Sequence, residues 1–204
     1  MLLPKDPYIL LSFLNTRLRD QYADLEDLCA SLDADEQSLR ETLAAAMVLL
    51  SRYRGKDPLC DPFCGSGTIP IEAALIAKNR APGLDRSFDA QRWAFLPAKV
   101  WMDAADEAMD KEFHGHYDIW GGDIDPAAVD LARHNAELAG VEDCIRFEVA
   151  DAGKFHRDSE YGQLVTNPPY GERLLEKKEA EDLYRMFGAA LRDLPPKWRS
   201  RRPS

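Results

Sequence analysis

From Ser38 onward, the apolar residues of the chain fall into short runs that alternate between two kinds of pattern. Compact runs bounded by Gly, Pro or Asp are typical of buried strands, and apolar residues at helical spacing indicate helices. Strands separated by helices of about 10–15 residues favour a parallel sheet with helices on both faces. The predicted elements are a buried helix over 43–50, strands over 58–61, 117–123, 144–150 and 163–166, and helices over 68–79, 126–138 (closed by Gly140) and 177–191.

Residues 1–37 have a different character, with three basic against eight acidic residues. Leu25, Leu28 and Leu32 repeat at helical spacing, so we expect a small acidic helical segment there. Short, closely joined helices are also found in DNA-reading proteins. The acidity argues against that interpretation, because phosphate contacts need Lys and Arg.

Residues 38–198 are the predicted main domain, and residues 199–204 form a basic tail. The tail is either a solvated terminus or a nucleic-acid contact. Segment 80–116 carries Trp93, Phe95 and Trp101 and is longer than a connection needs, so we expect a lid or additional helices covering the site. Because no strand pattern follows the last helix, either the fourth strand lies at the edge of the sheet or another strand comes from elsewhere.

The composition, 45% apolar and 30% charged residues in 204, is that of a globular protein and excludes a disordered chain. The net charge of −10 means that any nucleic-acid contact requires a local basic patch. Four scattered cysteines do not form a disulfide framework, and no signal peptide or membrane span is recognised. These features together predict a cytoplasmic protein.

A metal site is the first chemistry to consider, because Cys60 and Cys64 are closely spaced and His114 and His116 offer further ligands. No second cysteine pair completes a four-ligand set, so we expect no metal.

The strongest local signal is the loop from Asp61 to Thr68, which lies between a predicted strand and a predicted helix. Gly65 and Gly67 allow the backbone to approach a ligand, and the new helix offers unpaired N–H groups. Pro70 replaces the third glycine of the dinucleotide fingerprint, and the lysine of a phosphate-binding loop is absent. Since Asp61 would repel phosphate, a cationic ligand is favoured over a merely structural turn.

Carboxylates follow the next two strands as well. Asp123 is placed to accept hydrogen bonds from ribose hydroxyls in the crevice outside the strand ends, and Asp125 is better explained as the cap of the helix opening at Pro126. Asp151 ends the third strand. Any one of these acids alone is also explained as a cap or a solvated loop residue, but acids at three successive strand ends favour one binding site.

The fourth strand ends in Asn167-Pro168-Pro169-Tyr170. Two prolines stiffen this loop and remove two N–H donors, which leaves carbonyl acceptors facing outward. The Asn167 side-chain oxygen and the Pro168 carbonyl would hold a planar amine whose ring stacks on Tyr170. A loop that simply ends a strand is the structural alternative.

These motifs, in this order and spacing, resemble an S-adenosylmethionine-dependent methyltransferase that methylates amino groups. More narrowly, strings 61–74 and 167–173 are similar to the bacterial 23S rRNA guanine-N2 methyltransferases, a family often labelled N6-adenine-specific DNA methylase-like. The resemblance covers about residues 39–198. The first 37 residues do not resemble the family's RNA-binding THUMP domain, but a separate small bacterial family of unknown function.

The resemblance implies a Rossmann-like class I methyltransferase fold, here with a C-terminally truncated sheet, because the family's chain continues past Trp198 with a further strand and a hairpin. It also implies the site residues. The loop from Asp61 to Gly67 would line the methionine part of the cofactor, Asp123 the ribose, and Ile124, Asp151 and Ala152 the adenine, while Asn167 to Tyr170 would hold the target base. The implied cofactor-binding residues are Asp61, Phe63, Gly65, Gly67, Asp123, Ile124, Asp151 and Ala152, and the catalytic ones are Asn167, Pro168, Pro169 and Tyr170.

The function expected from this resemblance is methyl transfer from S-adenosyl-L-methionine to guanine N2 of 23S rRNA, with RNA as the partner. Adenine-N6 methylation of DNA or RNA stays open, because the loop from Asn167 to Tyr170 suits any planar amine. A truncated, inactive cofactor-binding fragment is the third reading.

Overall fold

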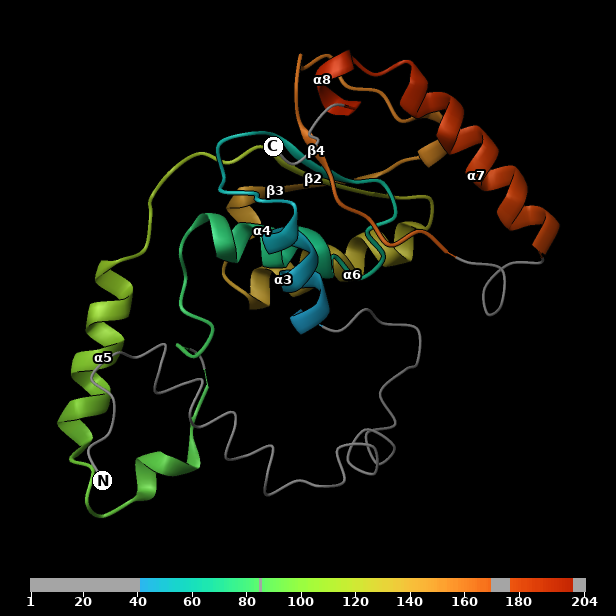
Figure 1. Cartoon of the computed structure of the whole chain (residues 1–204). Helices are drawn as coiled ribbons and strands as arrows, with labels where there is room; N and C mark the ends of the chain where they lie inside the picture. Colours follow the sequence, from blue (N-terminus) through green and yellow to red (C-terminus); the bar gives the residue numbers. More distant parts are fainter. Residues whose placement is uncertain (1–40, 85, 170–176, 200–204) are drawn as a thin grey trace. The chain divides into compact units, whose positions relative to one another are not determined.

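The computed structural model describes residues 41–84, 86–169 and 177–199. The chain divides into two compact units, Met1–Ser38 and Leu39–Ser204, and every described residue belongs to the second. The helices predicted within 1–37 therefore lie outside the described residues, as do residues 200–204 of the basic tail. The described elements, labelled as in Figure 1, are α3 Glu41–Leu50, β1 Leu59–Asp61, α4 Thr68–Ala77, η1 Asp89–Arg92, α5 Ala98–Asp110, β2 Ile119–Asp123, α6 Pro126–Leu138, η2 Glu142–Cys144, β3 Ile145–Val149, η3 Ala152–Lys154, β4 Gln163–Leu164, α7 Lys177–Arg192 and α8 Pro196–Arg199.

The strands and helices predicted between residues 43 and 191 are all present, with boundaries that differ by a few residues. Helix α6 has the predicted bounds, and its start is capped as expected, because the Asp125 carboxylate accepts a hydrogen bond from Ala127 N at 2.9 Å. Gly140, at φ 65°, follows its last turn. Strand β4 is shorter than predicted, with only two residues in the sheet.

The sheet has four parallel strands in the order β3-β2-β1-β4. Strand β1 lies at the point where the chain direction across the sheet reverses, since β2 pairs with one side of β1 and β4 with the other. Crevices outside the carboxyl ends of strands at such a point are the usual ligand sites of open α/β sheets. Strand β4 lies at an edge of the described sheet, which is the first of the two predicted alternatives.

Two apolar layers cover the two faces of this sheet. Leu59 and Ile119 point into the larger cluster, which includes Val48 of α3, Ile69 of α4 and Val129 of α6. The next residue of each strand points the other way, so the second cluster contains Cys60 of β1, Trp120 of β2, Ala152 of η3 and Phe187 of α7, together with Phe155 and Leu194. Figure 1 shows α3, α4 and α6 on one side of the strands and α7 on the other.

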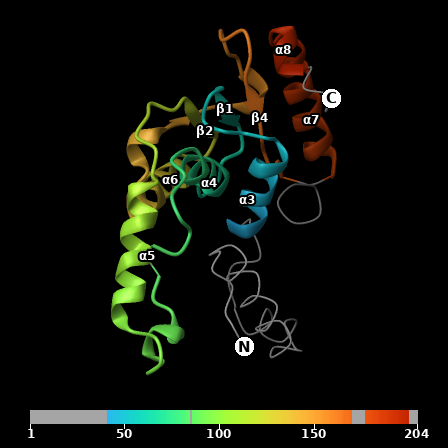
Figure 2. The same cartoon turned by 60° about the vertical axis from the view of Figure 1, so that its left-hand side comes forward.

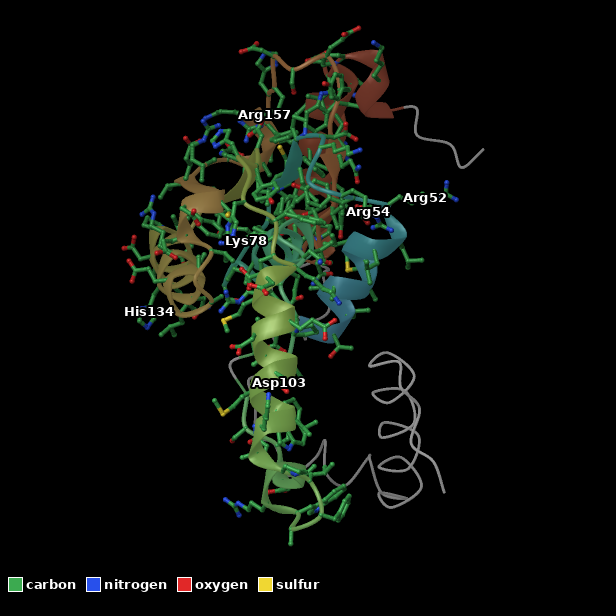
Figure 3. The ribbon with its side chains drawn as sticks, turned by 90° about the vertical axis from the view of Figure 1, so that its left-hand side faces the viewer. Arg52, Arg54, Lys78, Asp103, His134 and Arg157 are labelled. Atoms are coloured by element: carbon green, nitrogen blue, oxygen red, sulfur yellow. The ribbon has the colours of Figure 1, made fainter. Side chains whose placement is uncertain are left out.

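The second layer includes one half-buried cation, Arg157. The guanidinium of Arg157 lies 4.1 Å from the ring centroid of Trp120, and its Nε donates a hydrogen bond to the Cys60 sulfur at 3.3 Å. Figure 3 shows Arg157 among the side chains at the end of the molecule opposite α5. Stacking on an aromatic face compensates part of the cost of removing the guanidinium from water.

The long segment after α4 forms helices η1 and α5, but these helices do not cover the site. The Lys78 carbonyl accepts a hydrogen bond from Phe113 N at 2.7 Å, and Arg80 forms an ion pair with Glu112 at 3.2 Å. Both contacts lie at the C-terminal end of α4, whereas the glycine loop precedes its N-terminal end. Figure 2 shows α5 extending away from the sheet, and in Figure 3 Lys78 lies near the end of α5 closest to the core while Asp103 lies farther out. The expectation of a lid was therefore wrong, because the insert is attached at the far end of α4.

Candidate active site

Four loops meet at the carboxyl ends of the four strands, as the parallel sheet requires. Direct hydrogen bonds connect them. Gly65 N donates to Asp123 Oδ2 at 3.0 Å, Ala150 N donates to the Asp123 carbonyl at 2.8 Å, and Thr166 Oγ1 donates to Asp61 Oδ1 at 2.6 Å. The structure thus brings together the acids after β1 and β2 and the segments leading into Asp151 and Asn167.

The two glycines of the first loop have different surroundings. A Cβ on Gly67, which has φ 84°, would lie 2.9 Å from Ala132 Cβ and 3.0 Å from Phe147 Cζ. Gly67 therefore allows α4 to pack closely on α6 and β3. Gly65 also has a positive φ, 50°, but a Cβ there would meet no atom within 4 Å, so the backbone at Gly65 faces open space. Only Gly65 thus has room beside it for a ligand.

This contrast predicts different costs for two alanine substitutions. Gly67→Ala combines backbone strain with overpacking and should lower the free energy of unfolding by about 3 kcal/mol. Gly65→Ala introduces strain alone and should cost about 1 kcal/mol. Urea denaturation of both variants beside the wild type measures the difference, and equal losses would contradict the assignment of Gly67 to helix packing.

Asp61 is a buried carboxyl group, with 1% of its surface exposed. Its Oδ1 accepts hydrogen bonds from Phe63 N at 3.1 Å and from Thr166 Oγ1 at 2.6 Å. Burial raises the pKa of Asp61 to about 7, the nearby Asp123 carboxylate adds to that rise, and the two hydrogen bonds oppose it. A carboxylate so poorly solvated would be stabilised by a cation placed beside it.

The raised pKa of Asp61 has a measurable effect on stability. Because its pKa rises from 3.8 in the unfolded chain to about 7 in the folded protein, the folded state binds the extra proton between these values. The stabilisation that this group contributes is therefore complete below about pH 4 and is lost as the pH rises through about 7. Over this range the free energy of unfolding falls by up to ~1.4 kcal/mol per pH unit. Comparing urea denaturation of the wild type and Asp61→Asn without ligand isolates this group. A difference between the two proteins that stays constant from pH 5 to pH 8 would contradict it.

Asp123 connects the glycine loop to the end of β2. Its Oδ2 accepts the hydrogen bond from Gly65 N, and its Oδ1 accepts one from Asp125 N at 3.0 Å. Each carboxylate oxygen can accept a second hydrogen bond, so capacity for a hydroxyl donor remains. The next residue, Ile124, has 72% of its surface exposed, which places a large apolar side chain beside this carboxylate.

Asp151 has a structural role that the sequence also allowed. Its Oδ1 accepts a hydrogen bond from Gly153 N at 2.8 Å and caps η3, and Lys154 Nζ lies 3.6 Å from its Oδ2. Ala152 is buried in the second apolar cluster. Phe63 belongs to the edge of the same cluster, where its ring packs against Phe187 of α7 with centroids 5.1 Å apart.

The segment after β4 presents polar acceptors at the same end of the sheet. Asn167 is exposed, and Pro168 and Pro169 are half-buried. The Asn167 side chain makes no hydrogen bond with any residue that the structure describes. Tyr170 lies outside the described residues.

The predicted site residues do not include Thr166, which the structure places in direct contact with Asp61. The sequence feature that could have identified Thr166 is its hydroxyl directly before Asn167. This residue follows β4, and β4 lies next to β1, the strand that ends in Asp61. Reading it required the strand order, because β1 and β4 are more than 100 residues apart in the sequence but adjacent in the sheet.

Cys60 and Cys64 do not form a shared metal site. The side chain of Cys60 belongs to the second apolar cluster and that of Cys64 to the first, so they lie in opposite layers of the sheet. Burial raises the pKa of the Cys60 thiol to about 11 and that of Cys64 as well, which keeps both protonated. Within ranges 41–84, 86–169 and 177–199, no group of three or more metal-ligating side chains is found.

Among the same residues, no helix has the length and apolar character needed to cross a membrane.

Two solved structures share this architecture. A predicted N6-adenine-specific DNA methylase from Listeria monocytogenes is 43% identical, covers 82% of this chain and 44% of its own, and gives a TM-score of 0.76. SMU.472, crystallised in complex with SAH, is 37% identical, covers 80% of this chain and 43% of its own, and also gives a TM-score of 0.76.

Sequence relatives point the same way. The ribosomal RNA large subunit methyltransferase K/L of Aliivibrio fischeri is 42% identical over 173 residues, which make up 79% of this chain and 24% of that protein. The chain spans less than half the length of the curated relatives that it matches.

Residues 4–46 match a family described as a domain of unknown function, DUF4250. Residues 32–199 match the family described as the RMKL-like methyltransferase domain, and this chain belongs to that family.

Proposed function

We propose that this chain transfers a methyl group from S-adenosylmethionine to guanine N2 of 23S rRNA. The observation that carries the proposal is the buried carboxyl group of Asp61, which is hydrogen-bonded to the residue before Asn167 and belongs to the loop whose Gly65 faces open space. A cation-binding group and an amine-accepting loop thus meet at the carboxyl ends of β1 and β4. The likeness to the K/L enzymes supports ribosomal RNA as the substrate.

The residues at the carboxyl ends of the strands suit each part of S-adenosylmethionine. Asp61, Phe63, Gly65 and Gly67 form the loop proposed to hold the cationic methionine portion, with Gly67 acting through the packing of the loop. The remaining oxygen lone pairs of Asp123 would accept the ribose hydroxyls, and the exposed Ile124 would pack on adenine. Asp151 and Ala152 would lie beside the adenine amino group. The complex of the relative SMU.472 with SAH supports this cofactor.

Catalysis by this chain would consist of positioning. Bound in the crevice, S-adenosylmethionine supplies a methyl group that is electrophilic because it is attached to a positively charged sulfur. The Asn167 oxygen and the Pro168 carbonyl accept the two N–H bonds of the guanine amine, which turns the nitrogen lone pair toward the crevice. Pro169 keeps the loop stiff, and Tyr170 would stack on the base. As the new N–C bond forms, the bond between the methyl carbon and the sulfur breaks with its electron pair on sulfur, S-adenosylhomocysteine is left, and the amine releases one proton to water. Such positioning can supply several kcal/mol without a strong base.

We also propose a division of the chain into domains. Residues 38–198 form the methyltransferase domain, residues 1–37 form a separate head that the DUF4250 match over 4–46 supports, and residues 199–204 are an attached basic tail.

The experiment incubates the protein with S-adenosylmethionine and either 23S rRNA from cells lacking its gene or unmethylated DNA. We expect N2-methylguanosine in the digested rRNA and no methylated base in the DNA, measured by mass spectrometry of nucleosides. The name of the Listeria monocytogenes relative favours adenine-N6 transfer instead, and N6-methyladenine in either nucleic acid would establish that reading. Cofactor binding without any transfer would indicate an inactive fragment.

A further inference from the structure

We propose that Thr166 is a positioning residue that connects the carboxylate of Asp61 to the acceptor loop 167–169, so that cofactor binding and placement of the target amine depend on each other. This inference rests on the proposed function, because it assigns a role within that site. It adds Thr166, which lies one position before Asn167, to the residues proposed to form the site.

The geometry places the Thr166 hydroxyl at the junction of two strands. Strand β4 pairs with β1 through Cys60 and Leu164, and Val165 N donates to the Cys60 carbonyl at 3.1 Å. At the next residue, Thr166, the contact between the two strands is made by a side chain, because Thr166 Oγ1 donates a hydrogen bond to Asp61 Oδ1 at 2.6 Å. A hydroxyl donating to a carboxylate at this distance is a strong, charge-assisted hydrogen bond when Asp61 is ionised.

Among the described residues of the loop beyond Thr166, positions 167–169, side-chain and N–H hydrogen bonds are scarce. Pro168 and Pro169 have no N–H groups, and the Asn167 side chain has no hydrogen-bond partner among residues 41–84, 86–169 and 177–199. The stiffness of two consecutive prolines transmits the orientation of the residue before them. In the proposed role, the hydrogen bond of Thr166 at the base of the loop sets the direction in which Asn167 points.

The same hydrogen bond ties the loop to the charge of Asp61. Among the described residues, the titratable groups that interact electrostatically with Asp61 are the Asp123 carboxylate and the Cys64 thiol. Both are acidic, so neither stabilises the ionised form of Asp61. The Thr166 hydroxyl lowers the pKa of Asp61 against the larger effect of burial. A cation bound beside Asp61 favours the ionised carboxylate, which strengthens the bond to Thr166, and by linkage a well-placed loop favours cation binding.

The test compares Thr166→Val, which has nearly the same shape but no hydroxyl, with Thr166→Ser, which keeps the hydroxyl. The affinity for S-adenosylmethionine is measured by calorimetry from pH 5.5 to pH 8.5. For the wild type we expect the affinity to fall as the pH drops through about 7, where Asp61 becomes protonated. Thr166→Val should move this midpoint upward by about one pH unit, and Thr166→Ser should leave it unchanged.

The second readout is methyl transfer to 23S rRNA with saturating cofactor at pH 8.5. Thr166→Val should lower the turnover rate by about tenfold or more, whereas Thr166→Ser should retain most of it. An unchanged midpoint and turnover in Thr166→Val would overturn the inference, as would equal losses in the valine and serine variants. If Thr166→Val does not fold by circular dichroism, Thr166→Ala replaces it.

The two proposals fail in different ways. If the wild type transfers no methyl group to 23S rRNA, the proposed substrate is wrong, while the pH midpoint of cofactor binding still decides whether Thr166 acts on Asp61. If the wild type methylates the rRNA but Thr166→Val keeps the wild-type midpoint and rate, the function stands and the role of Thr166 is refuted.

Discussion

Replacing Asn167 by alanine should lower the turnover rate of methyl transfer by about a thousandfold or more and leave the affinity for S-adenosylmethionine unchanged. The substitution removes the amide oxygen that would hold the target amine. Because this side chain is exposed and makes no hydrogen bond within the described part of the chain, its loss should hardly affect folding. Single-turnover transfer to rRNA and calorimetry with the cofactor measure the two quantities separately.

A matched control is Asp158→Ala, which changes another exposed polar side chain, in the loop before β4. That variant should transfer methyl groups at the wild-type rate. Retained turnover in Asn167→Ala would contradict the role of the loop in holding the amine, and a loss of cofactor affinity in the same variant would indicate that Asn167 belongs to the cofactor site instead.

Replacing Asp123 by alanine should weaken the binding of S-adenosylmethionine by about a hundredfold. The change removes the acceptor that would bind the ribose hydroxyls, and it also removes the acceptor that holds Gly65 N in the glycine loop. Losing a charged acceptor for one or two hydrogen bonds costs about 1.5–3 kcal/mol each, which corresponds to this range of affinity. Calorimetry at pH 8, where Asp61 is mostly ionised, gives the dissociation constants without a contribution from its protonation.

Asp125→Ala provides the comparison, because this carboxylate is only two residues away and caps α6 through Ala127 N. It should lower the free energy of unfolding by about 1 kcal/mol and change cofactor affinity little. If Asp123→Ala binds the cofactor as tightly as Asp125→Ala does, Asp123 is not part of the site.

The order of strands and helices followed from local patterns alone. The apolar runs and the residues that bound them predicted every strand of the described sheet, and the sequence Asp125-Pro126 marked the start of α6 because the cap and the proline act within one helical turn. Parallel strands separated by helices place all carboxyl ends at one edge, so the convergence of the loops at Asp61, Asp123 and Asn167 was also predictable.

Other features depended on contacts between residues distant in the sequence. The insert after α4 looked like a lid because of its aromatic residues, but its attachment at Lys78 and Arg80 lies away from the site. Gly67 looked equivalent to Gly65 in the loop, yet its neighbours are Ala132 and Phe147, more than sixty residues further along. Neither result could be read from spacing, because spacing does not show which helix packs on which.

By itself, the sequence determined the class of fold, the family and the chemical types at the strand ends, since hydrophobic periodicity and short motifs are local properties. The tertiary structure alone decided that Asp61 is buried enough to have a pKa of about 7, that Cys60 and Cys64 lie in opposite layers, and that the Thr166 hydroxyl reaches Asp61. Burial and hydrogen bonding across the sheet arise only when distant segments pack together, and they set the electrostatics on which the proposed chemistry depends.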